Sequence, residues 1–285
     1  MSIVVIGLSL AAVLFLLSAG LTLIFGMLGV VNFAHGSFYM LGAYLGFQVI
    51  GLTGSFWLSL LVAPILGGLL GAVVEFVILR PVYGKPAHYQ MLLTFGVILM
   101  LEEAIRAIWG IDYHDVVAPR GLAAPTHLLG ATVSTYRVFI IVFGAGVAAV
   151  LFAVLDRTRI GVMVRAASTD PEMVGGLGID VGRMRTWVFA TGTGLAALAG
   201  AVTAPLFPVE PGMGFSVIID CFIVIIIGGL GSIQGAVVAS LLVGLVRALG
   251  YTFAPEWVDF ATYSLLIAVL LTRPQGLFGR QVRVA

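Results

Sequence analysis

The chain has 285 residues, of which 61% are hydrophobic and only 9% are charged. A soluble globular protein is about 45–50% apolar and about 25% charged, so a soluble fold would leave much of this apolar surface in water. The net charge of +1 gives no indication of a nucleic-acid partner, and the single Cys221 excludes a disulfide framework or a CxxC metal site. Composition therefore indicates a protein of the lipid bilayer.

Apolar windows follow one another along nearly the whole chain. A membrane-spanning helix needs about 20 mostly apolar residues. Such windows run roughly over 3–25, 37–52, 56–79, 90–109, 136–155, 186–206, 214–230, 233–250 and 258–272. The second and seventh are short, so either could be broken or re-entrant. A helix forms all its backbone hydrogen bonds within itself, whereas an open sheet edge in lipid would leave some unmade. We therefore predict an all-α, polytopic membrane protein with about eight or nine crossings and one transmembrane domain over residues 1–285.

Basic residues orient the predicted spans. One short polar segment between the fifth and sixth windows carries Arg157, Arg159, Arg165, Arg183 and Arg185. Because Lys and Arg favour cytoplasmic loops, this basic segment (residues 156–185) is predicted to be cytoplasmic. The same side is predicted for the 80–89 loop and for the C-terminus, which contain Arg80, Lys85, Arg273, Arg280 and Arg283. The N-terminus and the loops 110–135, 207–215 and 251–259 are then external.

Within the basic segment, the sequence predicts a short capped helix. Thr169 or Asp170 can cap its start, with Pro171 near the first position and Glu172 in the first turn. Three glycines within residues 175–178 end it after two turns. A short ordered helix between two spans suits docking to another protein, although an ordinary positive-inside loop explains the composition equally well.

Glycine and polar residues interrupt the apolar pattern at two places, the first break (residues 26–36) and the second break (residues 228–235). Gly26-x-Leu28-Gly29-x-Val31-Asn32 aligns with Gly228-x-Leu230-Gly231-x-Ile233-Gln234, a short match that chance could also produce. Paired breaks point to the binding site of a repeat-built transporter. We therefore predict a substrate pathway that includes Gly29, Asn32, His35, Ser37, Gly228, Gly231 and Gln234. Taken alone, His35 is better explained as a core histidine bonded to a backbone carbonyl.

Few ionisable residues lie inside the windows. Asp220 and Arg247 fall toward the outer ends of adjacent windows, and we predict an ion pair, with snorkelling to the interface as the alternative. The sequence has no GxxxxGK[ST], HExxH or GxSxG motif, so we predict no catalytic residue, no metal and no cofactor. If ATP drives transport, the ATPase is another chain. If an ion gradient drives it, the relay candidates are Glu75, His35 and Asp220.

Several motifs resemble those of one known family, and they are spread over nearly the whole chain: Gly20-Leu21-Thr22, Phe25-Gly26, residues 31–36, residues 41–44, Arg80-Pro81, Thr94-Phe95-Gly96, residues 161–166, Gly178-Ile179-Asp180, Ala199-Gly200, residues 228–232 and residues 273–279. In this combination and order they resemble the branched-chain amino-acid permeases of ATP-binding-cassette importers. The element at 31–36 is closer to the first of the family's two permease types.

The resemblance implies partners and a location. A second, related permease would form a pseudo-twofold dimer in the bacterial inner membrane, and an external solute-binding protein would deliver the substrate. Two cytoplasmic ATPases would bind the ATP and dock on the basic segment, through Arg165, Ala166, Asp170, Glu172, Gly176 and Gly178. Thr94 joins the pathway residues. The usual cargo is leucine, isoleucine and valine, while related systems carry other neutral amino acids, urea, short amides or small carboxylates.

Two other classes of function stay open at this point. An ion-coupled secondary transporter or channel would transport without any ATPase and would depend on Glu75 or Asp220. A membrane enzyme would have to use His35, but the sequence offers it no paired nucleophile or metal-binding set.

Overall fold

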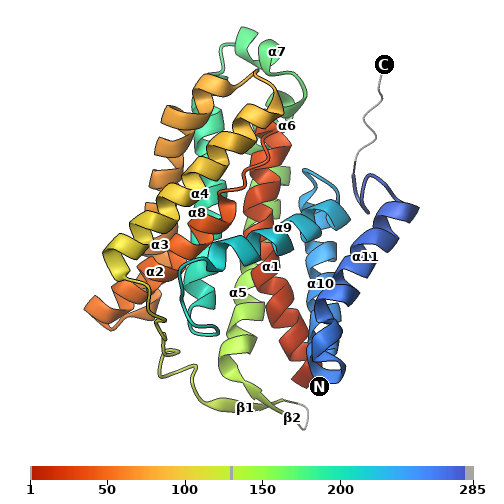
Figure 1. The fold of residues 1–285 in the computed structure, drawn as a ribbon. Helices are drawn as coiled ribbons and strands as arrows, with labels where there is room; N and C mark the ends of the chain where they lie inside the picture. The colour runs from red at the N-terminus through yellow and green to blue at the C-terminus, as the bar shows by residue number, and fades with distance from the viewer. Residues whose placement is uncertain (1, 129–130, 280–285) are drawn as a thin grey trace.

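The chain folds as a bundle of helices in a computed structural model that describes residues 2–128 and 131–279, so Arg280 and Arg283 lie outside the described residues (Figure 1). Each of the nine apolar windows corresponds to a helix: α1 (Ser2–Leu28), α2 (His35–Thr53), α3 (Phe56–Val74), α4 (Ala87–Trp109), α5 (Thr135–Arg157), α8 (Val181–Thr203), α9 (Met213–Gly228), α10 (Ile233–Phe253) and α11 (Val258–Thr272). By length and composition, five helical rods can cross a membrane: α1, α3 with its extension to Val82, α5, α8 and α10. The prediction of a polytopic helical membrane protein is confirmed.

Shorter elements join these helices. A π-helical turn, η1 (Glu75–Leu79), and a 3₁₀ turn, η2 (Arg80–Val82), extend α3, and a second 3₁₀ turn, η3 (Pro255–Trp257), precedes α11. The basic segment forms α6 (Arg159–Thr169) and α7 (Pro171–Gly176). The 110–135 loop contains an antiparallel hairpin that hydropathy did not predict, β1 (Pro125–Leu128) and β2 (Ala131–Ser134), which pairs Thr126 with Val133. β-branched residues such as these favour strands.

Small residues let α1, α2, α3 and α8 pack closely at the centre. Of the apolar stretch of α8, 72% is buried, against 17% for α5, so α8 lies in the core and α5 at the periphery. A Cβ placed on Gly42 of α2 would collide with the backbone of Ala197 in α8, and one on Gly200 of α8 with the backbone of Tyr39. Backbone-to-backbone contact of this kind is how helices associate in membranes, where lipid gives them no hydrophobic driving force.

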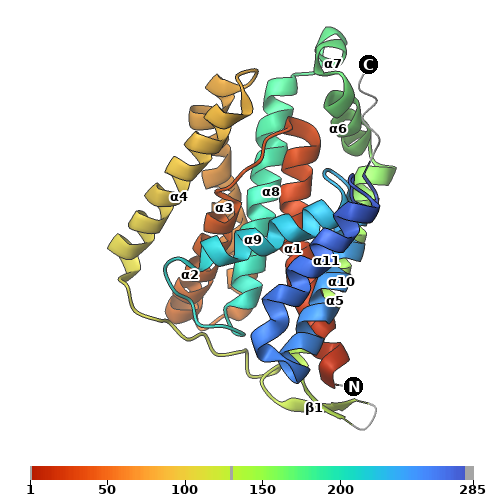
Figure 2. The same cartoon turned by 45° about the vertical axis from the view of Figure 1, so that its right-hand side comes forward.

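The elements divide between two opposite ends of the bundle. Figures 1 and 2 place α7 and the turn before α4 at one end, and the N-terminus and the β1–β2 hairpin at the other. This is the grouping that the basic residues predict. Both views also show α9 crossing α1 obliquely rather than running from end to end, so the short seventh window forms a partial crossing.

Candidate functional site

The first break separates α1 from α2. α1 ends at Leu28, and Gly29 takes a left-handed conformation (φ +66°) that glycine adopts without steric cost. Asn32 then shapes the turn: its side-chain Oδ1 accepts a hydrogen bond from the Ala34 N–H at 3.1 Å, and its carbonyl accepts one from the His35 N–H at 3.2 Å. Asn commonly forms such turns, because its side chain imitates a backbone acceptor.

His35 fixes the start of α2 against α1. Its Nε2 lies 2.9 Å from the carbonyl oxygen of Leu17, and the residue is fully buried. Because a carbonyl oxygen only accepts, Nε2 must carry the proton, which leaves Nδ1 as an acceptor. This is the core histidine bonded to a backbone carbonyl that the sequence suggested for His35 considered alone. Ser37 is buried in the next turn of the same helix.

The second break separates α9 from α10. α9 ends at Gly228, Gly229 (φ +100°) and Gly231 (φ +80°) reverse the chain, and Ser232 caps α10 by accepting from the Gly235 N–H at 3.1 Å. A Cβ on Gly228 would lie 2.5 Å from the carbonyl carbon of Gly235, so the two helices meet backbone to backbone. Gly29 and Gly231, which occupy equivalent positions in the aligned breaks, share the left-handed conformation.

A C-terminal strap (residues 274–279) covers the broken end of α9. The N–H groups of Leu277 and Phe278 donate to the carbonyls of Ile227 and Gly228 at 2.8 and 2.9 Å. The last carbonyls of a helix have no partner within the helix, so the strap satisfies two of them. Sequence reasoning recognised the motif at 273–279 only as a family resemblance. The left-handed Gly276 (φ +77°), which packs against Gly229, is the one local signal of a close approach.

The two breaks meet beside an apolar cavity. A Cβ on Gly26 would lie 3.4 Å from the Cα of Gly231, which places one break against the other. The adjacent cavity has a volume of about 310 Å³ and is lined only by apolar residues: Leu21, Phe25, Val31, Phe33, Phe222, Ile225, Ile226 and Leu230. Binding sites for small molecules range from about 300 to 1,000 Å³, so this cavity is large enough for a small solute.

Buried polar groups without partners lie close to the first break. Among the described residues, Ser18 Oγ, Thr22 Oγ1, Asn32 Nδ2 and His35 Nδ1 are buried and form no hydrogen bond. Leaving a buried polar group unsatisfied costs about 1–3 kcal/mol. The sequence indicated Asn32 and His35 as pathway residues, whereas Thr22 appeared only within a family motif and Ser18 not at all, because a hydroxyl inside an apolar helix gives no signal of its own.

Thr94 and Gln234 complete the set of predicted pathway residues. Thr94 is buried on α4, where its hydroxyl donates to the carbonyl of Met91 at 3.0 Å, and α4 packs against α2 and η1. Gln234 is exposed in the first turn of α10. None of the eight predicted pathway residues is among the residues that line the cavity. Gly29, Asn32, His35 and Ser37 lie at or next to the first break, Gly228, Gly231 and Gln234 at the second, and Thr94 on α4.

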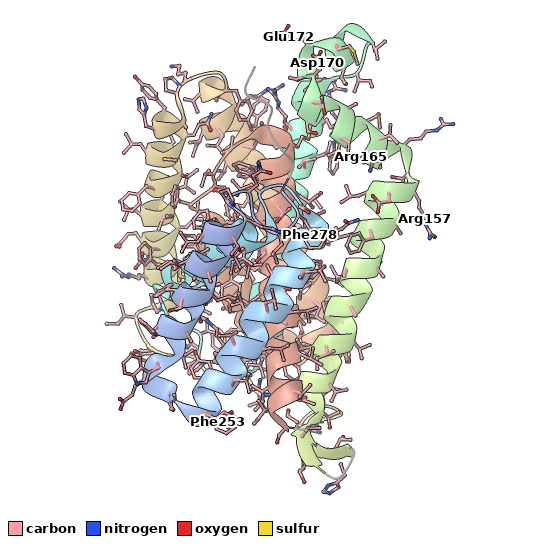
Figure 3. The ribbon with its side chains drawn as sticks, turned by 90° about the vertical axis from the view of Figure 1, so that its right-hand side faces the viewer. Arg157, Arg165, Asp170, Glu172, Phe253 and Phe278 are labelled. Atoms are coloured by element: carbon pink, nitrogen blue, oxygen red, sulfur yellow. The ribbon has the colours of Figure 1, made fainter. Side chains whose placement is uncertain are left out.

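The basic segment forms the short helix expected of it. Asp170 is its cap: Oδ1 accepts from the Met173 N–H at 2.9 Å, while Thr169 belongs to α6. Pro171 is the first residue of α7, Gly176 is the last, and Gly178 (φ +84°) turns the chain toward α8. Figure 3 shows Asp170 and Glu172 at the tip of this segment and Phe253 at the opposite end of the molecule.

α6 and α7 rest on the last turns of α1. Val174 is buried in one cluster with Val164 and Ala167 of α6, Val188 of α8 and Met27 of α1. Arg165 donates to the carbonyl of Leu155, and its guanidinium lies 3.7 Å from Asp156, which ties α6 to α5. Ala166 is half-buried, whereas Met173 and Leu177 are 59% and 73% exposed. The segment therefore exposes apolar side chains near its tip. It is anchored to the last turn of α1, which leads into the first break.

The relay candidates already have partners. The two terminal nitrogens of Arg247 each lie 2.5 Å from a carboxylate oxygen of Asp220, and Asp259 is 3.6 Å away, so the structure brings the expected pair together between α9 and α10. The buried Glu75 accepts hydrogen bonds from Tyr83 at 2.9 Å and Thr186 at 2.6 Å. Burial and the adjacent Glu75 raise the pKa of the Tyr83 phenol, which keeps it a proton donor.

Comparison with known proteins identifies the family. The model of the family described as "Branched-chain amino acid transport system / permease component" matches residues 3–270. The permease protein BraD of Pseudomonas aeruginosa is 30% identical and LivH of Escherichia coli K12 29% identical, each alignment covering 96% of this chain and 94% of the relative.

A more distant relative is named for a different cargo, and no solved structure is similar enough to compare. The fructose import permease protein FrcC of Rhizobium meliloti is 28% identical over 76% of this chain and 61% of its own length. No solved structure matches the chain. Because the family match spans nearly all of a polytopic helical bundle, the chain belongs to the family of branched-chain amino acid transport permease components, which are transport subunits rather than enzymes.

Proposed function

We propose that this chain carries branched-chain or other hydrophobic neutral amino acids across the bacterial inner membrane, as one permease subunit of an ATP-binding-cassette importer. One observation carries the proposal. The exposed tip of the basic segment is packed, through Val174 and Met27, onto the helix that runs into the first break and the apolar cavity. A push on α7 would therefore act on the helix whose Leu21 and Phe25 line the cavity.

The tip of the basic segment suits a protein partner. Met173 and Leu177 are exposed, the Asp170 cap keeps α7 ordered, and Glu172 lies beside them. Two cytoplasmic ATPases would bind ATP, dock here and on the second permease, and drive the pair between inward- and outward-open states. The roles of Arg165, Ala166, Gly176 and Gly178 would be to hold the shape of this surface, and the C-terminus would lie on the same cytoplasmic side.

The cavity favours an aliphatic cargo. Its eight lining residues are all apolar, and burial of each CH₂ group of a branched side chain is worth about 0.8 kcal/mol. FrcC, a relative named for fructose import, means that family membership alone does not decide the cargo. Sugars, urea and short amides have no branched aliphatic side chain for this wall to bury, so leucine-like amino acids fit better.

Two further partners complete the proposed importer. Leu230, at the edge of the cavity, is 50% exposed, and a second, related permease facing it would close the cavity into a passage between the two subunits. A solute-binding protein would dock at the end opposite α7. There Arg106 and Glu210 line a pocket of about 180 Å³, whose charges suit a polar contact.

An ion-coupled mechanism finds less support in the geometry. Asp220 is held by Arg247, Glu75 by two hydroxyl donors, and His35 Nε2 by the Leu17 carbonyl. A relay residue has to exchange protons or ions with a continuous path, and none of the three lines the cavity.

Two measurements test the proposal. One is leucine uptake by vesicles that contain both permeases, the two ATPases and the binding protein, and the other is co-purification of the ATPases with the permeases. Leu177→Ser should weaken ATPase co-purification about tenfold or more, because burying a leucine at an interface contributes about 1.5–3 kcal/mol. Phe253→Ser is the matched control. Phe253 is 74% exposed, against 73% for Leu177, and lies at the opposite end of the bundle. Its substitution should leave ATPase association unchanged.

Two other results would contradict the proposal. Substituting Glu172 and Gly176 together with Leu177 without any loss of ATPase association or uptake would remove the docking role of α7. Leucine uptake by vesicles that lack both ATPases would instead favour an ion-coupled transporter or a channel.

A further inference from the structure

Three buried polar groups without hydrogen-bond partners belong to residues next to those that line the apolar cavity. Ser18 and Thr22 are four residues apart on α1 and therefore share one face of the helix. Leu21 and Phe25, which line the cavity, occupy the same side of α1. Asn32 lies between Val31 and Phe33, which line the cavity from the loop that follows. The three polar residues are thus neighbours, on the same helix side or in the sequence, of residues that form the apolar wall.

All three groups can donate a hydrogen bond, unlike the fourth unpartnered group near the first break, His35 Nδ1, which accepts. Ser18 and Thr22 each present a hydroxyl, which can donate one hydrogen bond, and Asn32 Nδ2 can only donate. The other side-chain atom of Asn32, Oδ1, already accepts from the Ala34 N–H at 3.1 Å. Ser18, Thr22 and Asn32 are each at most 1% exposed, and the three groups form no hydrogen bond of normal length within residues 2–128 and 131–279. The Cys221 thiol of α9 lies beside the Ser18 hydroxyl.

We propose that Ser18, Thr22 and Asn32 form a subsite for the carboxylate of the transported amino acid, covered in this conformation and uncovered when α9 moves away from α1. The proposal rests on the function proposed above and names the contacts of its substrate. A carboxylate accepts only, so three donors on one side of the cavity match it. Because none of the residues lining the described cavity is charged, the carboxylate is held by neutral donors, and a transporter must also release its cargo.

The fold supplies the movement that would uncover the subsite. Phe222, Ile225 and Ile226 of α9 form the wall that faces Leu21 and Phe25 of α1. α9 is followed by two left-handed glycines, Gly229 and Gly231, whose missing side chains permit a change of backbone direction. A shift of α9 at this point would separate the two walls, and the three donors would then face the enlarged cavity.

The first experiment measures access to Thr22 in the complete importer. Cys221, the only cysteine, is replaced by Ala, and Thr22→Cys is introduced and treated with a small thiol reagent, with and without a trapped nucleotide. We expect Thr22→Cys to be modified at least about tenfold faster in one nucleotide state than in the other. Leucine at a saturating concentration should slow the reaction. The matched control is Ala19→Cys, on the same helix and equally buried, but packed against Phe15 and Ala236. It should stay unmodified in both states.

The chemical class of the ligand is tested by comparing two probes. Leucine should protect Thr22→Cys, whereas leucinamide, which lacks the carboxylate, should not. Equal protection by both, or modification of Thr22→Cys no faster than that of Ala19→Cys in every state, would overturn the proposal.

A second pair of variants keeps the proposal falsifiable if the cysteine variant folds poorly. Thr22→Val has the same shape without the hydroxyl, and Ser18→Ala removes the other one. Together they should lower leucine uptake at least about tenfold, as expected when hydrogen bonds to a charged group are lost, while ATPase co-purification stays at the level of the unmodified importer. Unchanged uptake would overturn the subsite alone. Failure of the unmodified importer to carry leucine would overturn the proposed function.

Discussion

The two breaks have similar sequences but different construction. The first is stabilised by buried polar side chains: Asn32 closes the turn and His35 bonds to α1. The second is built from glycines in close backbone contact, and the C-terminal strap satisfies its free carbonyls. Only the first break places buried, unpartnered polar side chains next to the cavity within the described chain.

This difference suggests a division of labour. Buried polar groups serve recognition, because each one without a partner favours any state that supplies one. Glycines and a strap held by a few hydrogen bonds serve movement, since hinges are short segments that absorb changes in φ and ψ. We therefore expect substitutions at the second break to affect folding stability more than those at the first, and substitutions at the first break to affect transport more than stability.

The largest effect on stability is expected from the ion pair that joins α9 and α10, the two helices on either side of the second break. Asp220→Ala should lower the free energy of unfolding by about 3–5 kcal/mol, because it leaves the largely buried Arg247 without its main partner. Denaturant titration of the purified protein measures this. Glu102→Ala, which removes an exposed pair with Arg106, is the control and should cost less than about 1 kcal/mol. Similar losses for the two variants would show that α9 and α10 are not fastened by this pair.

The next largest effect tests the close contact inside the second break. Gly228→Ala should destabilise the protein by about 1–3 kcal/mol, because the new Cβ would lie 2.5 Å from the carbonyl carbon of Gly235 and the helices would have to separate. Gly51→Ala in α2 is the control, since nothing lies within 4 Å of its Cβ position. Thermal unfolding in detergent measures both. An unchanged midpoint for Gly228→Ala would mean that the contact is not needed.

Hydropathy and capping rules predicted the helices well because both depend on neighbouring residues. Asp170, Pro171 and the glycines after Val174 place α7 within a residue of its observed ends. The interruptions at Gly29 and Gly231 likewise mark real chain reversals. Local chemistry was sufficient in each of these cases.

The arrangement of the site depends on contacts between segments far apart in the chain, which local patterns do not encode. The strap is held by a hydrogen bond between the backbone groups of Leu277 and Ile227. Such a bond does not depend on the side chains, so the sequence gives no signal of it. Thr94 was predicted as a pathway residue from its motif, and its place on α4, which packs against α2, becomes known only from the fold. Ser18 and Thr22 become candidates only once the cavity next to them is known.

A smaller effect is expected from releasing the strap. Gly276→Val should cost about 2 kcal/mol, roughly the sum of two net hydrogen bonds, because its side chain would collide with Gly229 and displace Leu277 and Phe278 from the end of α9. Hydrogen exchange should then speed up at residues 229–232. Gln275→Ala, at an exposed position of the strap, is the control and should not change exchange. Unchanged exchange in Gly276→Val would mean that the strap does not control the mobility of residues 229–232.

The smallest stability effect is expected at the first break, together with a large effect on transport. Asn32→Ala removes one turn hydrogen bond, from the Ala34 N–H to Oδ1, and should lower stability by about 1 kcal/mol. Uptake of leucine should fall at least about tenfold, because the variant also loses the Nδ2 donor that we assign to the carboxylate. Measured on one preparation, the ratio of uptake loss to stability loss should be higher for Asn32→Ala than for Gly276→Val. The reverse ratio would assign movement to the first break and recognition to the second, and so contradict the division drawn from their construction.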